Sequence, residues 1–369
     1  MGAIVPNSIV NADCLEAMKL LPDNSIDLIL SDPPYFKVKK EKWDRQWDTS
    51  DGFLEWLDLV AEQWHRILKP NGSLYCFASP RMAAKVEVKL GDRFNVCNHI
   101  VWNKLHEYEL GDPRATAYKV RDHDSFRLFF NYSERVIFCE HYGADNIAKG
   151  KTGYSAKCDE LRGFIFEPLR AYLDGERRKA GAGHRHIIEN VLGLTGHDSH
   201  YFSPVQWKIP VPEHYIKLQQ SFPGYFTRPY EELRLEYEEL RLEYEDLRLE
   251  YEDLRRPFSV TADVPYTDVW TYPTVSHYPG KHPCEKPLSM LEHIITASSR
   301  EGAIVLDSFS GSASTAIAAI NTNRKYICIE KDLNYFQTSC DRVANHSPNT
   351  PIAKVKKPKA APKGQLALF

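Results

Sequence analysis

The sequence has no apolar run of membrane-spanning length and no closely spaced pair among its eight cysteines. A helix that crosses a bilayer needs roughly 20 consecutive apolar residues, which argues against an integral membrane protein. The N-terminus also lacks the charged-then-apolar order of a secretion signal. Scattered cysteines are typical of reduced thiols and argue against a disulfide or zinc framework. We therefore expect a cytoplasmic protein.

The chain also has little net charge. Its formal charge is −3, which by itself argues against a polyanionic partner. Residues 230–256 carry eleven acidic and five basic residues, however, so the rest of the chain has 42 bases against 39 acids. Affinity for nucleic acid would have to come from local basic patches. With 369 residues, the chain can hold one large α/β domain and an insertion.

The tetrapeptide Asp32-Pro33-Pro34-Tyr35 follows an apolar, β-favouring run at positions 26–31. Two successive prolines cannot continue a ladder of backbone hydrogen bonds, so the chain must turn where this strand ends. Open α/β sheets bind their ligands at that edge. A carboxylate and a fixed carbonyl can accept both N–H hydrogens of an exocyclic amine, while an aromatic ring stacks on a planar base. The alternative is a proline-rich turn with Tyr35 as a core aromatic.

A second signal lies at positions 303–318, which indicate a strand, a tight turn of small residues and a helix. Gly311 would let the backbone approach a ligand closely, and the start of the helix adds unpaired N–H donors. The next strand, at 325–330, ends in Glu330. A carboxylate one strand after a glycine turn is placed to bind ribose hydroxyls, so the pattern predicts a nucleoside-cofactor pocket.

Both motifs resemble those of the DNA amino-methyltransferases. Asp32-Pro33-Pro34-Tyr35 is similar to the catalytic motif of that family, and the segment at 307–312 is similar to its S-adenosylmethionine (SAM) loop. The catalytic motif comes first and the cofactor loop last, which is the permuted order of the β class. The resemblance covers residues 8–140 and 266–345.

The resemblance implies an α/β, Rossmann-like fold with an inserted, mainly helical target recognition domain, and SAM as the cofactor. It assigns catalysis to Asp32, Pro33, Pro34 and Tyr35. Its cofactor-contacting positions fall on Asp13, Lys286, Asp307, Phe309, Gly311, Ser312 and Glu330. Two positions depart from the family pattern, because Ala12 and Ala313 stand where glycines are common. Their methyl groups would narrow the cofactor pocket.

The expected reaction is methyl transfer to N6 of an adenine that is flipped out of double-stranded DNA at a specific site. The Asp32 carboxylate and the Pro33 carbonyl would accept from the amine, and Tyr35 would stack on the base. N4-cytosine methylation is the alternative within the enzyme class. A DNA-binding scaffold on the same fold is the alternative outside it. An enzyme of this kind is expected to be bacterial or phage-encoded, nucleoid-associated and related to restriction–modification.

Changes in pattern divide the chain into four regions. Residues 1–140 and 266–345 are predicted to form the two halves of the catalytic domain, and residues 141–265 the inserted recognition region. Within the insertion, helical patterns at 164–175, 186–191 and 212–220 are compatible with a helix-turn-helix reader of DNA.

Side chains that could contact DNA lie in two places. A basic loop with interleaved tryptophans follows the catalytic turn and could close over an extruded base; the alternative is a solvated loop. The insertion adds a stretch rich in aromatic residues and histidines. The candidates are Lys39, Lys40, Trp43, Arg185, His200 and Trp207. No cysteine stands at finger spacing from the histidines at 184, 186, 197 and 200, so we predict no metal site.

A heptad repeat covers residues 230–256, with tyrosine and leucine three positions apart in each repeat. This spacing predicts one long helix with an apolar seam. The seam could form an intermolecular coiled coil and a homodimer, or pack against its own domain, or the helix could act as a spacer.

The C-terminal region, residues 346–369, is lysine- and proline-rich and is predicted to be a flexible linker. It ends in Gln365-Leu366-Ala367-Leu368-Phe369, which resembles the motif that docks bacterial proteins into the replication sliding clamp. The resemblance assigns that contact to Gln365, Leu366, Leu368 and Phe369. A tail that folds back onto the core is the alternative.

Overall fold

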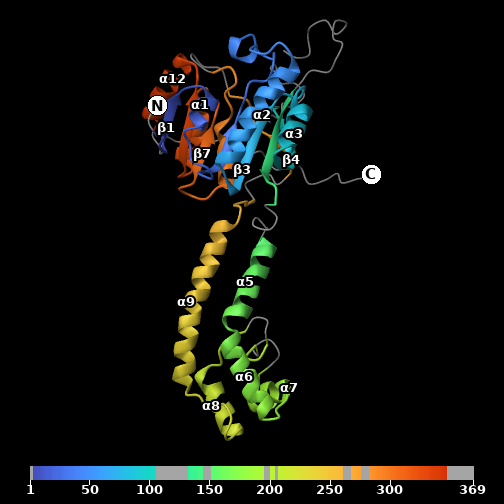
Figure 1. The fold of residues 1–369 in the computed structure, drawn as a ribbon, viewed down its shortest axis with the longest axis vertical. Coiled ribbons are helices and arrows are strands. Elements are labelled where there is room, and N and C mark those ends of the chain that lie inside the picture. The colour runs from blue at the N-terminus through green and yellow to red at the C-terminus, as the bar shows by residue number, and fades with distance from the viewer. Residues whose placement is uncertain are drawn as a thin grey trace, which may run out of the picture.

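The structure is a computed structural model that describes residues 3–104, 132–143, 151–194, 200–203, 207–260, 267–275 and 282–346. It shows an α/β body and a helical arm that runs away from it (Figure 1). None of the helices in these ranges combines the length and the apolar character that crossing a membrane requires. In the same ranges, no three His, Cys, Asp or Glu side chains gather as a metal ligand set would.

The α/β body is built on an eight-stranded sheet with the order β1-β8-β7-β2-β3-β5-β4-β6. Strands pair in parallel except for β5, which is antiparallel to both neighbours. The strands are β1 (Ser8–Asn11), β2 (Ile26–Ser31), β3 (Leu68–Ala78), β4 (Phe94–Asn103), β5 (Ser133–His141), β6 (Val269–Thr271), β7 (Ile304–Asp307) and β8 (Lys325–Glu330).

Strands from distant parts of the sequence meet at the centre of this sheet. β7 and β8 come from the C-terminal part of the chain, yet they lie between β1 and β2. From β2 the chain proceeds to β3 on one side, and from β7 it proceeds to β8 on the other. The strand order therefore reverses between β2 and β7, which is the topological switch point where such sheets bind ligands.

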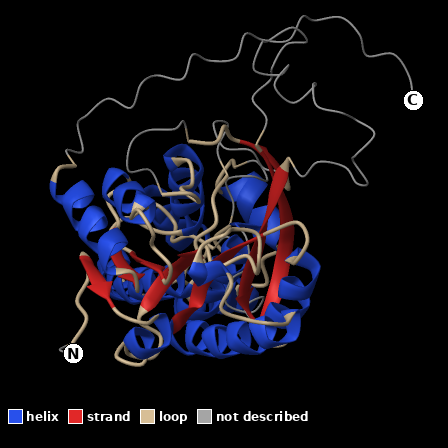
Figure 2. Ribbon diagram, turned by 90° about the horizontal axis from the view of Figure 1, so that it is seen from above, coloured by secondary structure: helices blue, strands red, loops and turns tan. Residues whose placement is uncertain are grey.

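Helices cover both faces of the sheet (Figure 2). One core cluster contains α1 (Cys14–Met18), α2 (Ser50–Ile67) and α3 (Ala83–Gly91), and the other contains α10 (Leu288–Ser298) and α11 (Ser314–Asn321). A further helix, α12 (Leu333–Ala344), contacts β1 and β8. Because both faces are covered, the central strands can be almost wholly buried, as β2 is. The predicted α/β fold is confirmed.

The arm has a separate hydrophobic core. Its elements are α5 (Lys151–Ile165), α6 (Glu167–Lys179), the short α7 (His184–His186), a π-helical turn at Ile187–Val191, α8 (Pro212–Ser221) and α9 (Tyr230–Leu254). The predicted helix at 164–175 is in fact parts of two helices that meet at Phe166. Pro168 explains this break, because proline lacks the N–H that a continuous helix would need and is favoured at a helix start.

The heptad helix α9 packs its tyrosine–leucine seam onto its own arm. Leu233 and Tyr244 are buried in the arm core, and the Tyr237 ring stacks on Phe166 with 5.3 Å between centroids. The seam therefore packs within the chain, which is one of the three arrangements expected. A different row of leucines, at 235, 242 and 249, remains exposed.

The arm joins the α/β body at the edge of the sheet where β2 and β3 begin. Asn71 donates to the carbonyl of Asp253 at 2.7 Å, and Arg300 donates to the carbonyl of Arg255 at 2.9 Å. β2 and β7 end at the opposite edge, so the arm leaves the body on the side away from that edge. Figure 1 shows α9 and α5 extending in that direction.

Candidate active site

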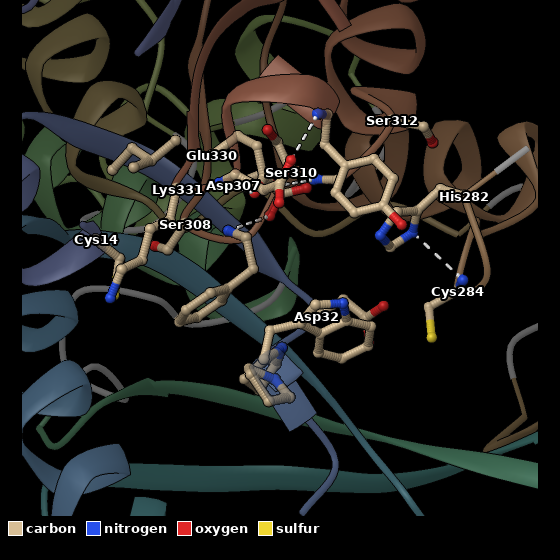
Figure 3. A pocket seen from close by; sticks show the side chains of 18 of the residues that line it. Cys14, Asp32, His282, Cys284, Asp307, Ser308, Ser310, Ser312, Glu330 and Lys331 are labelled. Atoms are coloured by element: carbon tan, nitrogen blue, oxygen red, sulfur yellow. Dashed lines mark hydrogen bonds between the residues drawn. The ribbon is translucent and has the colours of Figure 1, made fainter. Parts of the chain in front are cut away.

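A pocket lies at the switch point, where β2 and β7 end. It has a volume of about 460 Å³. Its walls include every predicted catalytic residue (Asp32, Pro33, Pro34, Tyr35) and every predicted cofactor position (Asp13, Lys286, Asp307, Phe309, Gly311, Ser312, Glu330). Figure 3 shows Asp32 facing the cluster of Asp307, Ser310 and Glu330 across this space. Two motifs about 275 residues apart in sequence thus share one cavity, because their strands are neighbours.

The two oxygens of the Asp32 carboxylate are in different situations. Oδ2 accepts a hydrogen bond from Lys286 Nζ at 2.5 Å. Oδ1 is buried and accepts no hydrogen bond from the described residues. Burial raises the pKa of Asp32, and the nearby Lys286 ammonium opposes this shift. The site therefore contains a buried acceptor that is free to receive a donor from a ligand.

Lys286 binds protein carboxylates here, although the sequence predicted a contact with the cofactor. Its Nζ lies 2.5 Å from Asp32 Oδ2 and 3.4 Å from Glu134 Oε2. Sequence reasoning missed Glu134, which lies on β5 and also accepts from the Tyr35 hydroxyl at 2.7 Å. No local motif marks Glu134, because only the pairing of β5 with β3 brings it to the pocket.

The catalytic turn is held by a second residue that sequence reasoning missed. Asp44 is fully buried, and its carboxylate accepts from the backbone N–H groups of Tyr35 at 2.6 Å and Lys39 at 2.5 Å. Phe36 and Lys37 adopt left-handed backbone conformations with φ of 59° and 61°. The Asp44 carboxylate thus closes the basic loop back onto the end of the catalytic motif.

Gly311 takes the conformation that the predicted cofactor turn requires. Its φ is +51°, and a Cβ there would lie 3.0 to 3.2 Å from the His282 ring. Its N–H donates to Glu330 Oε2 at 2.8 Å. Next to it, the hydroxyl of Ser310 is buried and unpaired among the described residues. Ala313, where a glycine is common in the family, is buried with φ of 57°.

Asp307 organises the turn from within. Its carboxylate accepts from the Phe309 N–H at 3.0 Å and from the Thr315 hydroxyl at 2.6 Å. Burial raises the pKa of Asp307 to about 7. The Asp307 carboxylate therefore holds the turn that faces the pocket.

The remaining cofactor candidates lie around the same turn. Asp13 caps α1 by accepting from the Leu15 N–H at 3.0 Å, and its second oxygen pairs with Lys331 at 3.1 Å. Phe309 packs against Trp56 with 5.6 Å between ring centroids, and Ser312 is buried beside Ser314. Acidic groups, a glycine turn and an apolar ring therefore line this end of the pocket.

The predicted DNA contacts separate into two groups. In the basic loop, Lys39 and Trp43 line the pocket, Trp43 stacks on His282 with 6.2 Å between centroids, and Lys40 is exposed. Arg185 and His200 lie on the arm, which leaves from the opposite edge of the sheet, and Arg185 is exposed.

Trp207 is not a surface residue, contrary to the prediction. It is buried in the arm core, where its ring stacks on Phe166 and its indole N–H donates to the Tyr201 carbonyl at 2.7 Å. A large apolar ring contributes more by burial than by exposure, and its single donor is satisfied internally. The predicted clamp contacts, Gln365, Leu366, Leu368 and Phe369, lie outside the described residues.

Several known proteins have sequences similar to that of this chain. A family model described as N6_N4_Mtase, DNA methylase, matches residues 26–341. The chain is 25% identical over 362 residues to the DNA adenine methyltransferase YhdJ of Escherichia coli (strain K12), covering 95% of this chain and 88% of that protein. It is 37% identical over 92 residues to the type II methyltransferase M2.MboI of Moraxella bovis, covering 24% of this chain and 34% of that protein.

Among solved structures, the M1.HpyAVI–SAM complex is similar to the chain at 18% identity, with a TM-score of 0.45 over 91% of this chain and 98% of that chain. The family match includes both the turn at Asp32 to Tyr35 and the glycine turn at Gly311. The chain therefore belongs to the N6/N4 DNA methylase family.

Proposed function

We propose that the protein is a site-specific DNA adenine methyltransferase, which transfers a methyl group from SAM to N6 of a flipped-out adenine. The observation that carries this proposal is the unpaired Oδ1 of Asp32 at the pocket. A buried acceptor without a donor costs free energy, so a ligand that supplies an N–H is favoured there. The exocyclic amine of a base supplies such a group.

Asp32, Pro33 and Tyr35 would act on the amine by positioning and charge. Asp32 Oδ1 and the Pro33 carbonyl would accept hydrogen bonds from the two N–H groups of the amine. These bonds favour a pyramidal nitrogen whose lone pair points at the methyl donor. The carboxylate also stabilises the positive charge that develops on nitrogen. Tyr35 stacks on the base and fixes its plane, so the reacting atoms are held in line.

The far end of the pocket fits SAM. Gly311 has a left-handed backbone and lets the turn lie close to the His282 ring, where a Cβ would be crowded, and the Ser310 hydroxyl is a buried group without a partner among the described residues. Glu330 and Asp13 have carboxylates at the pocket wall that suit hydroxyl and amino groups. When bound, SAM supplies an electrophilic methyl group on a sulfonium.

Adenine is favoured over cytosine on two grounds. One relative, which matches 95% of the chain, is described as a DNA adenine methyltransferase. The first residue of the catalytic motif is aspartate, whereas the resemblance associates serine with N4-cytosine enzymes. The target atom lies inside the duplex, so the base must leave the stack at a cost of a few kcal/mol.

Two partner assignments belong to the same proposal. The basic loop with Lys39, Lys40 and Trp43 is proposed to contact DNA beside the pocket. The terminal residues Gln365 to Phe369 are proposed to bind a sliding clamp, on sequence grounds alone. A pull-down with clamp, using the full chain and a chain without its last five residues, tests this contact; equal binding would contradict it.

The arm is proposed as the inserted recognition region, with Arg185 and His200 as contact candidates. Since it leaves the body opposite the pocket edge, its tip and the pocket of the same chain face different directions. A gel-shift comparison of wild type with Arg185→Ala on target-containing and target-free duplexes tests this assignment. Unchanged discrimination between the two duplexes would count against it.

The methyl-transfer proposal is tested by nucleoside analysis of DNA treated with protein and isotope-labelled SAM. The expected product is N6-methyladenine, and Asp32→Ala should abolish it while SAM still binds. N4-methylcytosine as the product would establish the alternative base. Absence of any methylated nucleoside, with SAM bound and DNA present, would defeat the proposal.

A further inference from the structure

Two carboxylates and two ammonium groups from separate parts of the chain meet beside the pocket that Asp32 lines. Lys286 Nζ lies 2.5 Å from Asp32 Oδ2 and 3.4 Å from Glu134 Oε2, and Lys104 donates to the other oxygen of Glu134. The side chains of Lys286, Glu134 and Asp32 are only 7%, 14% and 18% exposed. Such a cluster is costly unless every charge is paired, so its presence at the pocket calls for a role.

Aromatic rings surround the Lys286 ammonium on its other sides. Its Nζ lies 4.9 Å from the centroid of Phe77, 5.2 Å from Tyr35 and 5.9 Å from Trp102. These rings attract a cation and leave it little freedom to move. Lys286 is therefore fixed in place by the fold.

We infer that Lys286, held by Glu134, is a positioning residue that keeps Asp32 ionised and occupies Oδ2, so that only Oδ1 is offered to the substrate amine. This inference rests on the proposed function, and it replaces the predicted contact of Lys286 with the cofactor. It assigns no chemical step to Lys286 itself.

The physical reason is the low polarity around Asp32. Burial raises the pKa of Asp32, the Lys286 ammonium lowers it, and the Glu134 carboxylate raises it again. A protonated Asp32 would carry a hydrogen on one oxygen and would accept the amine hydrogens less well. Loss of Lys286 should therefore remove the main charge that keeps the acceptor in its active form.

Other titratable groups that face Asp32 do not replace this charge. They come from the catalytic turn (Tyr35), from β3 (Cys76), from the segment before α10 (Cys284) and from β7 (Asp307). Burial raises the pKa of each of them, so the tyrosine and the cysteines stay neutral near pH 7. Lys104 acts through Glu134, to which it is bound.

The test is the pH dependence of single-turnover methyl transfer at saturating SAM, for wild type and Lys286→Met. The acid limb of the wild-type profile reports the ionisation of Asp32. In Lys286→Met this limb should move to higher pH by about one unit or more, which lowers the rate about tenfold at pH values below the limb. The dissociation constant for SAM should change little.

A control Lys–Asp pair is available at the other end of β2. Lys69 pairs with Asp27 at 2.6 Å near the start of β2, at the other edge of the sheet. Lys69→Met removes a comparable Lys–Asp pair without touching the pocket. Its acid limb should coincide with that of wild type.

Glu134→Gln is a second variant, and it should shift the acid limb in the opposite direction. On its own it should move the acid limb to lower pH, and in the Lys286→Met background it should restore part of the shift. The readout of the Glu134→Gln single variant also applies if Lys286→Met does not fold.

An unchanged acid limb in a folded Lys286→Met, or in Glu134→Gln if the former does not fold, would overturn the inference. So would a loss of SAM affinity in Lys286→Met without a shift of the limb, because that result assigns Lys286 to the cofactor. If wild type methylates no DNA base, the proposed function itself fails; the two failures are therefore distinguishable.

Discussion

The Asp44 carboxylate accepts the backbone N–H of Tyr35 at 2.6 Å and joins the catalytic turn to the basic loop that follows it. The same carboxylate accepts from the Lys39 N–H, and the Asp44 carbonyl accepts from the Lys37 N–H at 2.8 Å. The loop expected to cover the target base is thus fixed to the residue expected to stack on that base. A change in the loop should be felt directly at Tyr35.

Asp44→Asn should lower the rate of methyl transfer about tenfold or more. An amide has one accepting oxygen, so its NH₂ would face one of the two backbone donors, and a hydrogen bond to a charged group contributes about 1.5–3 kcal/mol. Single-turnover rates measure the effect, with Asp48→Asn, at an exposed position of the same loop, as control. Equal rates for Asp44→Asn and wild type would show that the loop does not position Tyr35.

Gly311→Ala should weaken SAM binding about tenfold. The added Cβ would lie 3.0 Å from the His282 ring, and the left-handed φ adds a cost of about 1–2 kcal/mol for a residue with a side chain. Calorimetric titration with SAM measures the change. Gly181→Ala is the matched control, because Gly181 has a similar φ of +65° with no atom within 4 Å. A similar affinity for both variants would separate the turn from SAM binding.

Trp207→Ala should destabilise the arm by about 3–5 kcal/mol, since it removes a large ring from a packed core. Urea unfolding followed by tryptophan fluorescence or circular dichroism measures the loss. Leu235→Ala, at a side chain that is 61% exposed on the same arm, should change the free energy of unfolding by less than about 0.5 kcal/mol. Unchanged stability of Trp207→Ala together with a reduced affinity for DNA would instead support a direct contact between Trp207 and DNA.

Asp307 should make the protein less stable as pH rises from about 4 to about 7. Burial raises its pKa from 3.8 to about 7 in the fold, so the folded state holds a proton that the unfolded state has released over this range. The contribution to the free energy of unfolding is complete below the unfolded pKa and is lost as pH rises through the folded one. Asp307→Asn should therefore flatten this part of the stability profile. Parallel profiles for both proteins would refute the shift.

Local sequence was sufficient to predict the two halves of the pocket. The paired prolines after a buried strand and the glycine turn before a helix each specify a backbone geometry with few alternatives. Parallel strands end at one edge of a sheet, so Asp32 and Gly311 could be expected to face one cavity. Both line it in the structure.

The surroundings of those residues could not be predicted in the same way. Glu134 reaches Lys286 only because β5 inserts antiparallel between β3 and β4, and Lys286 reaches Asp32 from 254 positions away. Periodicity in the insertion indicated helices, but Trp207 points into their core and the arm leaves from the far edge of the sheet. Neither the inward orientation of Trp207 nor the position of the arm can be predicted from a short segment of sequence.

The sequence by itself determined which groups this protein can use: an acceptor at a strand end, a glycine turn, a carboxylate one strand later and a seam on a long helix. Tertiary structure decided which charge faces which. The electrostatic state of Asp32 depends on Lys286, which lies 2.5 Å from Asp32 and 3.4 Å from Glu134. Such distances follow from strand order and helix packing rather than from neighbours in the chain.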